Sequence, residues 1–240
     1  MADGRPKSNL GPDVLPLPFP ETVVFDLDGT LVDTAPDLTA ALNAVMIREG
    51  RPAVPLDEVR HMVGRGARVL IERAMAASGL PAEARQTKTL VEHFLEYYDA
   101  NIAVTSKPFE GAELCVRRLA ARGHKIGICT NKPEALSLKL MSALNLRDLF
   151  PVILGADSRP YRKPDPRHLL DTIAELGGQP NSAVLIGDSE TDVATARAAN
   201  VPVVLVSFGY TETPVHQLGG DIVIDHFDAL EAALRAVGRA

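Results

Sequence analysis

The 240-residue sequence has little of what marks several specialised classes of protein. It contains only two cysteines, Cys115 and Cys129, and their spacing is not that of metal ligands, so we interpret both as reduced thiols. It has no apolar run long enough to cross a membrane. It also has no apolar core of the kind that begins a signal peptide. We therefore expect a cytoplasmic protein with no membrane partner.

The sequence also lacks an excess of positively charged residues. The formal net charge is -6 and the pI is about 5.5, whereas nucleic-acid-binding proteins usually present a basic face. We therefore expect no nucleic-acid partner. A small anionic substrate remains compatible with this charge, because local charge decides whether such a ligand binds. The length allows one large or two small domains with a sizeable core.

The N-terminal half divides into three stretches of different pattern. Residues 1–20 contain five prolines and predict a flexible, partly extended tail. The β-branched and aromatic run at 22–25 predicts a buried strand. Residues 35–104 then show helical spacing without a convincing strand, and Thr34 and Asp37 have the spacing of a capping box at the first helix. We predict that residues 35–104 form a helical cap domain inserted after the first strand.

From residue 105 onward, strand and helix patterns alternate. Apolar runs at 125–129, 152–154, 183–186 and 203–206 are separated by helical patterns, which is typical of βαβ units. This predicts an α/β fold, with a parallel sheet covered by helices on both faces and built from residues 21–34 and 105–240. Such sheets carry their sites at the carboxyl ends of the strands. Because Asp26, Thr130 and Asp188 each follow a predicted strand, we expect them at one edge.

The pair Asp26 and Asp28 places two carboxylates at a strand end. One carboxylate can attack phosphorus and form an acyl-phosphate, while the other protonates the leaving oxygen and then deprotonates water. The alternative is an Asp-Gly turn that ends the strand. That alternative explains Asp28 and Gly29, but it does not explain why Asp26 stands directly after an apolar run.

Asp188 follows the apolar run 184–187 and predicts a metal site. A carboxylate there, beside Asp26, would form a hard oxygen site suited to Mg²⁺. Asp192 lies four residues further on, at the start of a predicted helix. It could contact the metal site directly or through water, and we favour an indirect role. The alternative is an acid that complements the helix dipole.

Thr130, Asn131 and Lys163 are candidate phosphate ligands. A hydroxyl and backbone N–H groups at a strand-to-helix turn can cradle a phosphate, although Thr130 and Asn131 could also cap the helix that follows. Lys163 lies in a loop stiffened by prolines at 160, 164 and 166, which could aim its ammonium group at a phosphate and at Asp26. The alternative is a solvent-exposed loop lysine.

The predicted cap contains one candidate substrate loop, Gly64-Arg65-Gly66. Its glycines allow either close approach to a ligand or a tight turn. Arg60 or Arg65 could bind a substrate carboxylate through two parallel hydrogen bonds. Two surface arginines are an equally good interpretation.

The ordered motifs resemble those of the haloacid dehalogenase-like phosphohydrolases, and the resemblance covers about residues 23–230. The segments that carry it are 25–33, 36–38, 63–67, Thr130-Asn131-Lys132-Pro133, 163–166, 187–189 and 208–210. The resemblance implies a Rossmann-like core with an inserted helical cap. It also implies that Asp26 is the nucleophile and Asp28 the acid/base. Mg²⁺ would be bound by Asp26, the backbone carbonyl of Asp28 and Asp188, and the phosphoryl group by Thr130 and Lys163.

Within this family, 2-phosphoglycolate is the substrate that we expect. Sugar phosphates, amino-sugar acid phosphates and pyrophosphate are alternatives with the same chemistry, and a phosphomutase is another. A non-catalytic protein that binds a phosphorylated ligand is the alternative from a different class, and the intact acidic residues argue against it. We expect a small phosphorylated metabolite as the partner and a monomer or homodimer as the assembly.

Overall fold

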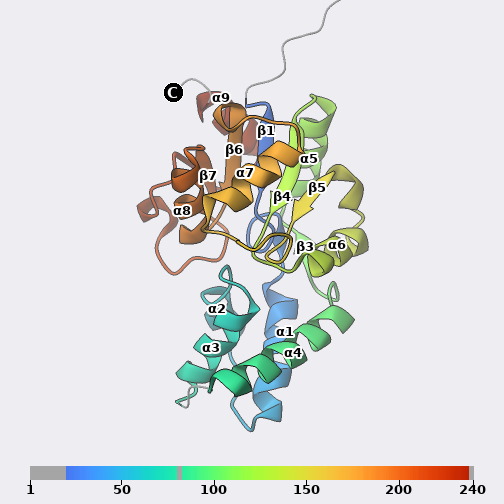
Figure 1. Cartoon of the computed structure of the whole chain (residues 1–240), viewed down its shortest axis with the longest axis vertical. Coiled ribbons are helices and arrows are strands. Elements are labelled where there is room, and N and C mark those ends of the chain that lie inside the picture. Colours follow the sequence, from blue (N-terminus) through green and yellow to red (C-terminus); the bar gives the residue numbers. More distant parts are fainter. Residues whose placement is uncertain (1–19, 80–82, 238–240) are drawn as a thin grey trace, which may run out of the picture.

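The structure, a computed structural model, describes residues 20–79 and 83–237. Its centre is a six-stranded sheet of order β5-β4-β1-β6-β7-β8, and all neighbouring strands are parallel (Figure 1). The strands are β1 (Thr22–Phe25), β4 (Lys125–Cys129), β5 (Val152–Leu154), β6 (Ala183–Gly187), β7 (Val203–Val206) and β8 (Ile222–Ile224). The predicted parallel sheet is confirmed. The predicted tail lies outside the described residues, apart from Pro20.

Helices cover both faces of this sheet, as predicted. On one face lie α5 (Ala112–Ala121), α6 (Glu134–Ala143) and α9 (Leu230–Val237), and on the other lie α7 (Pro166–Glu175) and α8 (Glu190–Ala199). Successive strand side chains point to opposite faces. Val23 and Phe25 therefore join the first hydrophobic cluster, and Val24 joins the second. A strand buried on both faces requires a continuous apolar run, which is what the sequence has.

Four further helices lie beyond the carboxyl ends of the strands, in the lower half of Figure 1. They are α1 (Ala35–Arg48), α2 (Leu56–Arg60), α3 (Ala67–Ala77) and α4 (Ala84–Ala100), and α4 packs against α1 and α3. These helices make up most of the segment predicted as a cap. No helix in the described ranges combines the length and the apolar character that a bilayer crossing requires.

Two short strands, one before α1 and one after α4, pair with each other as an antiparallel ladder. It pairs β2 (Val32–Asp33) with β3 (Lys107–Pro108). Sequence patterns do not predict this ladder, because strands of two residues carry no periodic signal. The ladder brings together the two chain segments that connect the four helices to the sheet.

The predicted capping box at the start of α1 is wrong. Thr34 has helical backbone angles, and its hydroxyl donates to Asp28 Oδ1 at 2.6 Å instead of capping the helix. Asp37 accepts from the backbone N–H groups of Thr105 and Ser106, at 3.0 and 2.8 Å, and from the Ser106 hydroxyl at 2.7 Å. Contacts across the two connecting segments replace the local cap. Asp37 therefore ties the start of α1 to the segment that follows α4.

Candidate active site

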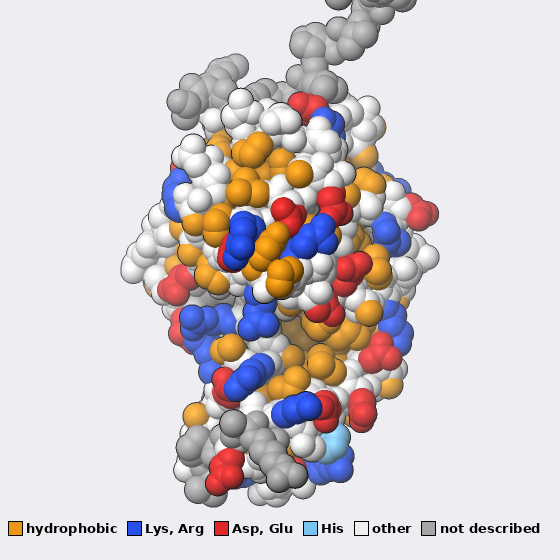
Figure 2. Space-filling view, in the orientation of Figure 1, with side chains coloured by type: hydrophobic (Ala, Val, Ile, Leu, Met, Phe, Trp, Pro, Cys, Tyr) orange, Lys and Arg blue, Asp and Glu red, His pale blue; other side chains and the backbone are white. Residues whose placement is uncertain are grey.

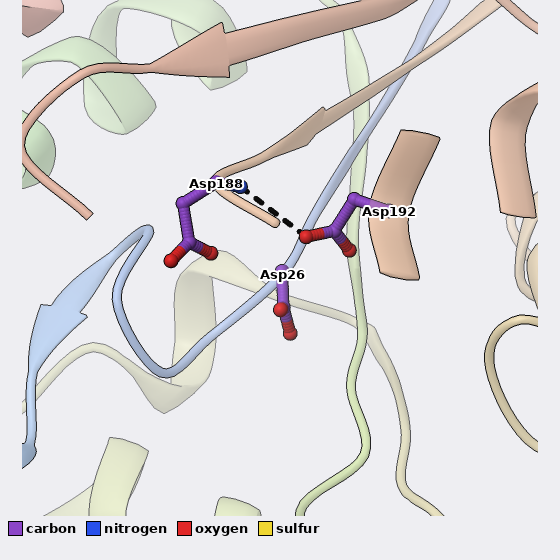
Figure 3. Close-up of side chains that lie close together, drawn as sticks. All are labelled: Asp26, Asp188 and Asp192. Atoms are coloured by element: carbon purple, nitrogen blue, oxygen red, sulfur yellow. Dashed lines mark hydrogen bonds between the residues drawn. The ribbon is translucent and has the colours of Figure 1, made fainter. Parts of the chain in front are cut away.

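Three neighbouring strands bring acidic and hydroxyl side chains to one edge of the sheet. Asp26 follows β1, Thr130 follows β4 and Asp188 follows β6. Carboxylate oxygens of Asp26, Asp188 and Asp192 all lie within 4.8 Å of one another, and all three residues are buried (Figure 3). The structure thus groups Asp26 and Asp188 as the sequence predicted, and it places Asp192 in the same cluster.

Asp188 is held by two donors from different parts of the chain. The Thr30 hydroxyl donates to Oδ1 at 2.8 Å, and the backbone N–H of Tyr210 donates to Oδ2 at 2.6 Å. Residue 209 has to be glycine for this approach, because a Cβ there would lie 2.2 Å from Asp188 Cβ. Burial raises the pKa of Asp188 well above its usual range, and the nearby Asp192 and Asp26 carboxylates raise it further.

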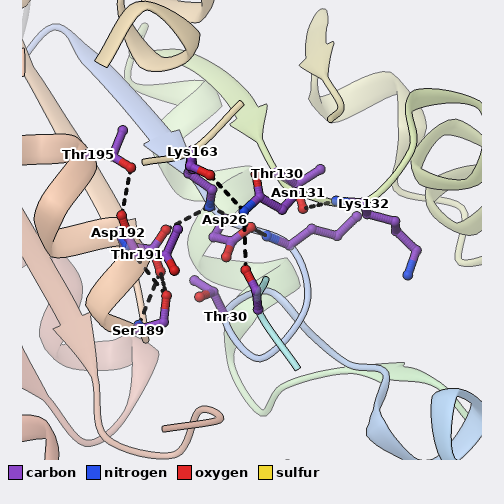
Figure 4. Close-up of polar contacts among 12 residues, drawn as sticks. Asp26, Thr30, Thr130, Asn131, Lys132, Lys163, Ser189, Thr191, Asp192 and Thr195 are labelled. Atoms are coloured by element: carbon purple, nitrogen blue, oxygen red, sulfur yellow. Dashed lines mark hydrogen bonds and ion pairs between the residues drawn. The ribbon is translucent and has the colours of Figure 1, made fainter. Parts of the chain in front are cut away.

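Lys163 is a buried lysine that pairs with two of these carboxylates. Its Nζ lies 3.0 Å from Asp26 Oδ1 and 2.7 Å from Asp192 Oδ1 (Figure 4). Burial alone would lower the pKa of Lys163, but the Asp192 and Asp26 carboxylates raise it above its ordinary value. Burial also raises the pKa of Asp26 to about 6, even though Lys163 acts in the opposite direction. The interpretation of Lys163 as a solvent-exposed loop residue is therefore wrong.

The two carboxylate oxygens of Asp192 accept hydrogen bonds from different groups. Oδ1 accepts from Lys163, whereas Oδ2 accepts from the Ser189 hydroxyl at 2.6 Å and from the Asp188 and Ser189 backbone N–H groups at 3.2 and 3.1 Å. Ser189 and Asp192 form a capping box at the start of α8. The helix-start interpretation thus holds together with a contact to the site.

Asp28 contacts a lysine that the sequence analysis did not select. Asp28 Oδ1 accepts from the Thr34 hydroxyl at 2.6 Å and from Lys132 Nζ at 2.9 Å. The Lys132 side chain is only 4% exposed. The residue belongs to the motif Thr130-Asn131-Lys132-Pro133, and its position directly after a strand was the signal available. Its partner was hidden, because Asp28 lies more than a hundred residues away in the sequence.

Asn131 joins the candidate substrate loop to the core. Its side-chain N–H₂ donates to the carbonyl of Lys163 at 3.1 Å and to that of Gly64 at 3.3 Å. Beside it, the Thr130 hydroxyl accepts from the backbone N–H of Lys132 at 3.2 Å. These contacts place the loop between α2 and α3 directly over the end of β4.

The glycines of the candidate loop adopt positive φ angles, and the arginine between them is exposed. Gly64 has φ +100 and Gly66 has φ +90, in a region that glycine adopts easily. Arg65 is exposed and lies away from the small cavity that the two glycines border. Arg60 is engaged with Asp33 at 3.5 Å and with Asp57 at 3.3 Å. These ion pairs favour the surface interpretation of Arg60.

A cavity of about 50 Å³ lies between the sheet edge and the four helices. The carboxylates of Asp26 and Asp28 border it on the sheet side, and Leu38, Leu70 and Phe94 border it on the helical side. A wider opening of about 590 Å³ lies beside it and is lined by arginines at 65, 73 and 162. Figure 2 shows a hollow bordered by hydrophobic side chains between the two halves of the molecule, with Lys and Arg side chains beside it.

The charges of the acidic cluster suit a divalent cation. Asp26, Asp188 and Asp192 are buried, and Lys163 is the one cation that pairs with this cluster among the described residues. Full ionisation would therefore leave two uncompensated negative charges, which is costly away from water. Burial, and then the neighbouring Asp192 carboxylate, raise the pKa values of Asp26 and Asp188 accordingly. Carboxylate oxygens are the ligands that Mg²⁺ prefers, so these residues fit that ion.

Known proteins are similar to this chain in sequence and in fold. The haloacid dehalogenase-like hydrolase pattern matches residues 23–206. A phosphoglycolate phosphatase of Caulobacter vibrioides is 51% identical over 206 residues, which are 86% of this chain and 87% of the relative. A phosphoglycolate phosphatase of Mesorhizobium japonicum is 45% identical over 221 residues, covering 90% of this chain and 97% of the relative.

The solved structures agree with the sequence comparison. The crystal structure of a predicted phosphoglycolate phosphatase from Haemophilus somnus superposes with a TM-score of 0.82 at 26% identity. The superposition covers 89% of this chain and 97% of that one. The ordered motifs, the parallel sheet and these relatives lead to one assignment: the chain belongs to the haloacid dehalogenase-like hydrolase family.

Proposed function

We propose that the protein is a Mg²⁺-dependent phosphatase that hydrolyses 2-phosphoglycolate to glycolate and inorganic phosphate. The observation that carries this proposal is the buried Asp26 carboxylate, which lies 3.0 Å from the Lys163 ammonium and borders a small cavity together with Asp28. The names of the relatives at 51% and 45% identity support the substrate. The proposed activity needs no nucleic acid and no membrane. We propose that the protein acts in the cytoplasm.

In the first step, an Asp26 carboxylate oxygen attacks phosphorus, and the bond from phosphorus to the glycolate oxygen breaks. Protonated Asp28 gives its proton to that leaving oxygen, so glycolate departs and Asp26 carries an acyl-phosphate. The contacts to Asp28 support this assignment. Both of its described hydrogen bonds go to Oδ1, which leaves Oδ2 for proton transfer.

In the second step, the Asp28 carboxylate takes a proton from water, and the water oxygen attacks phosphorus. The bond to the Asp26 oxygen breaks, inorganic phosphate leaves, and both carboxyl groups return to their starting states. Thr130 and Lys163 would hold the phosphoryl group during both steps, and Asp192 would fix the position of the Lys163 ammonium. Bound Mg²⁺ would offset the negative charge of the phosphoryl oxygens. Asp26, Asp188 and the backbone carbonyl of Asp28 would hold the ion.

We further propose that residues 35–104 act as a cap over a core formed by residues 21–34 and 105–240. Two contacts support this division. The Gly64 carbonyl accepts from Asn131 of the core, and Gly64 and Gly66 border the cavity that reaches Asp26. A closed cap would exclude bulk water while Asp26 attacks, which protects the acyl-phosphate until glycolate has left.

The test is a comparison of kcat/KM for 2-phosphoglycolate, glucose 6-phosphate and pyrophosphate with Mg²⁺ present. We expect 2-phosphoglycolate to give the highest value, a chelator to abolish turnover, and added Mg²⁺ to restore it. A higher kcat/KM for glucose 6-phosphate would overturn the assignment of 2-phosphoglycolate as substrate, whereas the proposed phosphatase chemistry would stand. Turnover that is indifferent to chelation would overturn the metal assignment, and no phosphate release from any ester would overturn the whole proposal.

A further inference from the structure

The small cavity contains a hydroxyl group that the proposed chemistry does not use. Tyr98 lies on α4, its side chain borders the cavity, and the residue is 1% exposed. Its Oη has no hydrogen-bond partner among the residues that the structure describes. A buried hydroxyl without a partner costs free energy, and such groups in folded proteins are almost always satisfied by protein, water or ligand. The position of Tyr98 in the cavity points to a ligand.

An ammonium group lies beside this hydroxyl. Lys132 Nζ lies over the Tyr98 ring, 4.3 Å from its centre, and 2.9 Å from Asp28 Oδ1. The short distance to Asp28 Oδ1 is that of an ion pair between an ammonium group and a carboxylate. An ammonium group has three N–H donors, and Asp28 takes one of them in the described contacts. Lys132 therefore has donors to spare at the cavity wall.

We propose that Lys132 Nζ and Tyr98 Oη bind the carboxylate of the substrate's leaving group and make the site selective for short phosphate esters that carry a carboxylate. This inference rests on the proposed phosphatase function. Asp28 would lie between the two ends of such a substrate. It is two residues from Asp26, which would receive the phosphoryl group, and it contacts Lys132, which would bind the carboxylate.

The rest of the cavity supports this chemistry. Leu38, Leu70 and Phe94 offer no hydrogen bonds, and the Asn131 amide already donates to the Gly64 and Lys163 carbonyls. Apart from the Thr130 hydroxyl, which is assigned to the phosphoryl group, the lining side chains with donors for a carboxylate are therefore Lys132 and Tyr98. The volume of about 50 Å³ is of the order of one or two water molecules, which suits a two-carbon acid better than a hexose. The exposed Arg65 lies outside this cavity, which separates this carboxylate site from the arginine site considered from the sequence.

The experiment measures the ratio of kcat/KM for 2-phosphoglycolate to kcat/KM for ethyl phosphate, which has the same chain length and no carboxylate. Tyr98→Phe removes only the hydroxyl group. We expect the ratio to fall about tenfold, chiefly through a higher KM for 2-phosphoglycolate, because a hydrogen bond to a charged group is lost. Tyr97→Phe is the matched control, because this neighbour on α4 is 41% exposed and should leave the ratio unchanged.

Three results would separate this inference from the proposed function. Hydrolysis of both esters by the wild type with a ratio near one would overturn the carboxylate site and leave the phosphatase activity. An unchanged ratio in a folded Tyr98→Phe protein would also overturn it. Hydrolysis of neither ester would overturn the proposed function itself. Lys132→Gln provides a second variant, and it too should lower the ratio if the ammonium group binds the carboxylate.

Discussion

Two buried lysines border the candidate site, and their surroundings differ. Lys163 pairs with Asp26 and Asp192, in a cluster that also contains Asp188. Lys132 pairs with Asp28 alone and lies over the ring of Tyr98. The first cluster has three carboxylates for one ammonium group, whereas the second has one for one. The first is therefore short of positive charge and the second is balanced.

This difference separates what each half of the site can bind. A charge deficit in a buried cluster favours a cation, and burial together with the nearby Asp192 carboxylate raises the pKa values of Asp26 and Asp188. A balanced pair with spare N–H donors at an apolar cavity instead favours a small anionic group. The two lysines thus lie in surroundings of different net charge, although each lysine contributes the same charge.

The largest effect is expected at Asp26, the proposed nucleophile in the charge-deficient half. Asp26→Asn should lower kcat by roughly 10⁴-fold or more, because an amide cannot form the acyl-phosphate. Steady-state phosphate release is the measurement. The fold should persist, since asparagine has nearly the same volume as aspartate. Asp57→Asn, at a side chain that is 89% exposed, is the control. Retained activity in Asp26→Asn would remove Asp26 from the nucleophile role.

The two lysines themselves should differ in how much stability they contribute. Lys163→Met leaves Asp26 and Asp192 buried without a cation, so we expect the unfolding free energy to fall by about 3–5 kcal/mol in the presence of a chelator. Lys132→Met should cost less, because Asp28 keeps its bond from Thr34 and its side chain is 13% exposed. Urea unfolding of both variants, with the exposed Lys88→Met as control, measures this. Equal losses would erase the proposed distinction.

The smallest effect is expected at His168, which accepts a hydrogen bond from the Lys163 backbone N–H. Burial, and then the Lys163 charge, lower the pKa of this histidine to about 4. The neutral ring is thus favoured in the folded state. Its stabilising contribution is complete above the unfolded pKa of about 6.5 and is lost as the pH falls towards 4. The unfolding free energy should decrease over that window by at most about 1.4 kcal/mol per pH unit.

Comparison with His168→Gln isolates the contribution of His168 from that of the acids, which titrate over the same range. Glutamine can still accept from the Lys163 backbone N–H, as His168 Nδ1 does at 3.3 Å. The variant should show a flatter pH dependence between pH 6.5 and 4, whereas the exposed His216→Gln should follow the wild type. Parallel curves for wild type and His168→Gln would contradict the prediction.

The sequence predicts the charge-deficient half better than the balanced half. Asp26 and Asp188 follow apolar strands, and a parallel sheet brings the carboxyl ends of its strands to one edge, so their proximity follows from the topology. The contact between Lys132 and Tyr98 depends instead on how α4 packs against the loop after β4. Helix packing sets that distance, and no local pattern in the sequence encodes it.

Asp37 does not form the predicted capping box, but its contacts matter for how the four helices are connected to the sheet. By accepting from Thr105 and Ser106, its carboxylate holds the segments before and after the proposed cap side by side. The two ends of the proposed cap are therefore adjacent. A chimaera that exchanges the proposed cap between related hydrolases should keep Asp37 together with residues 105 and 106. The hydrogen bonds between them would then hold the two ends of the exchanged segment together.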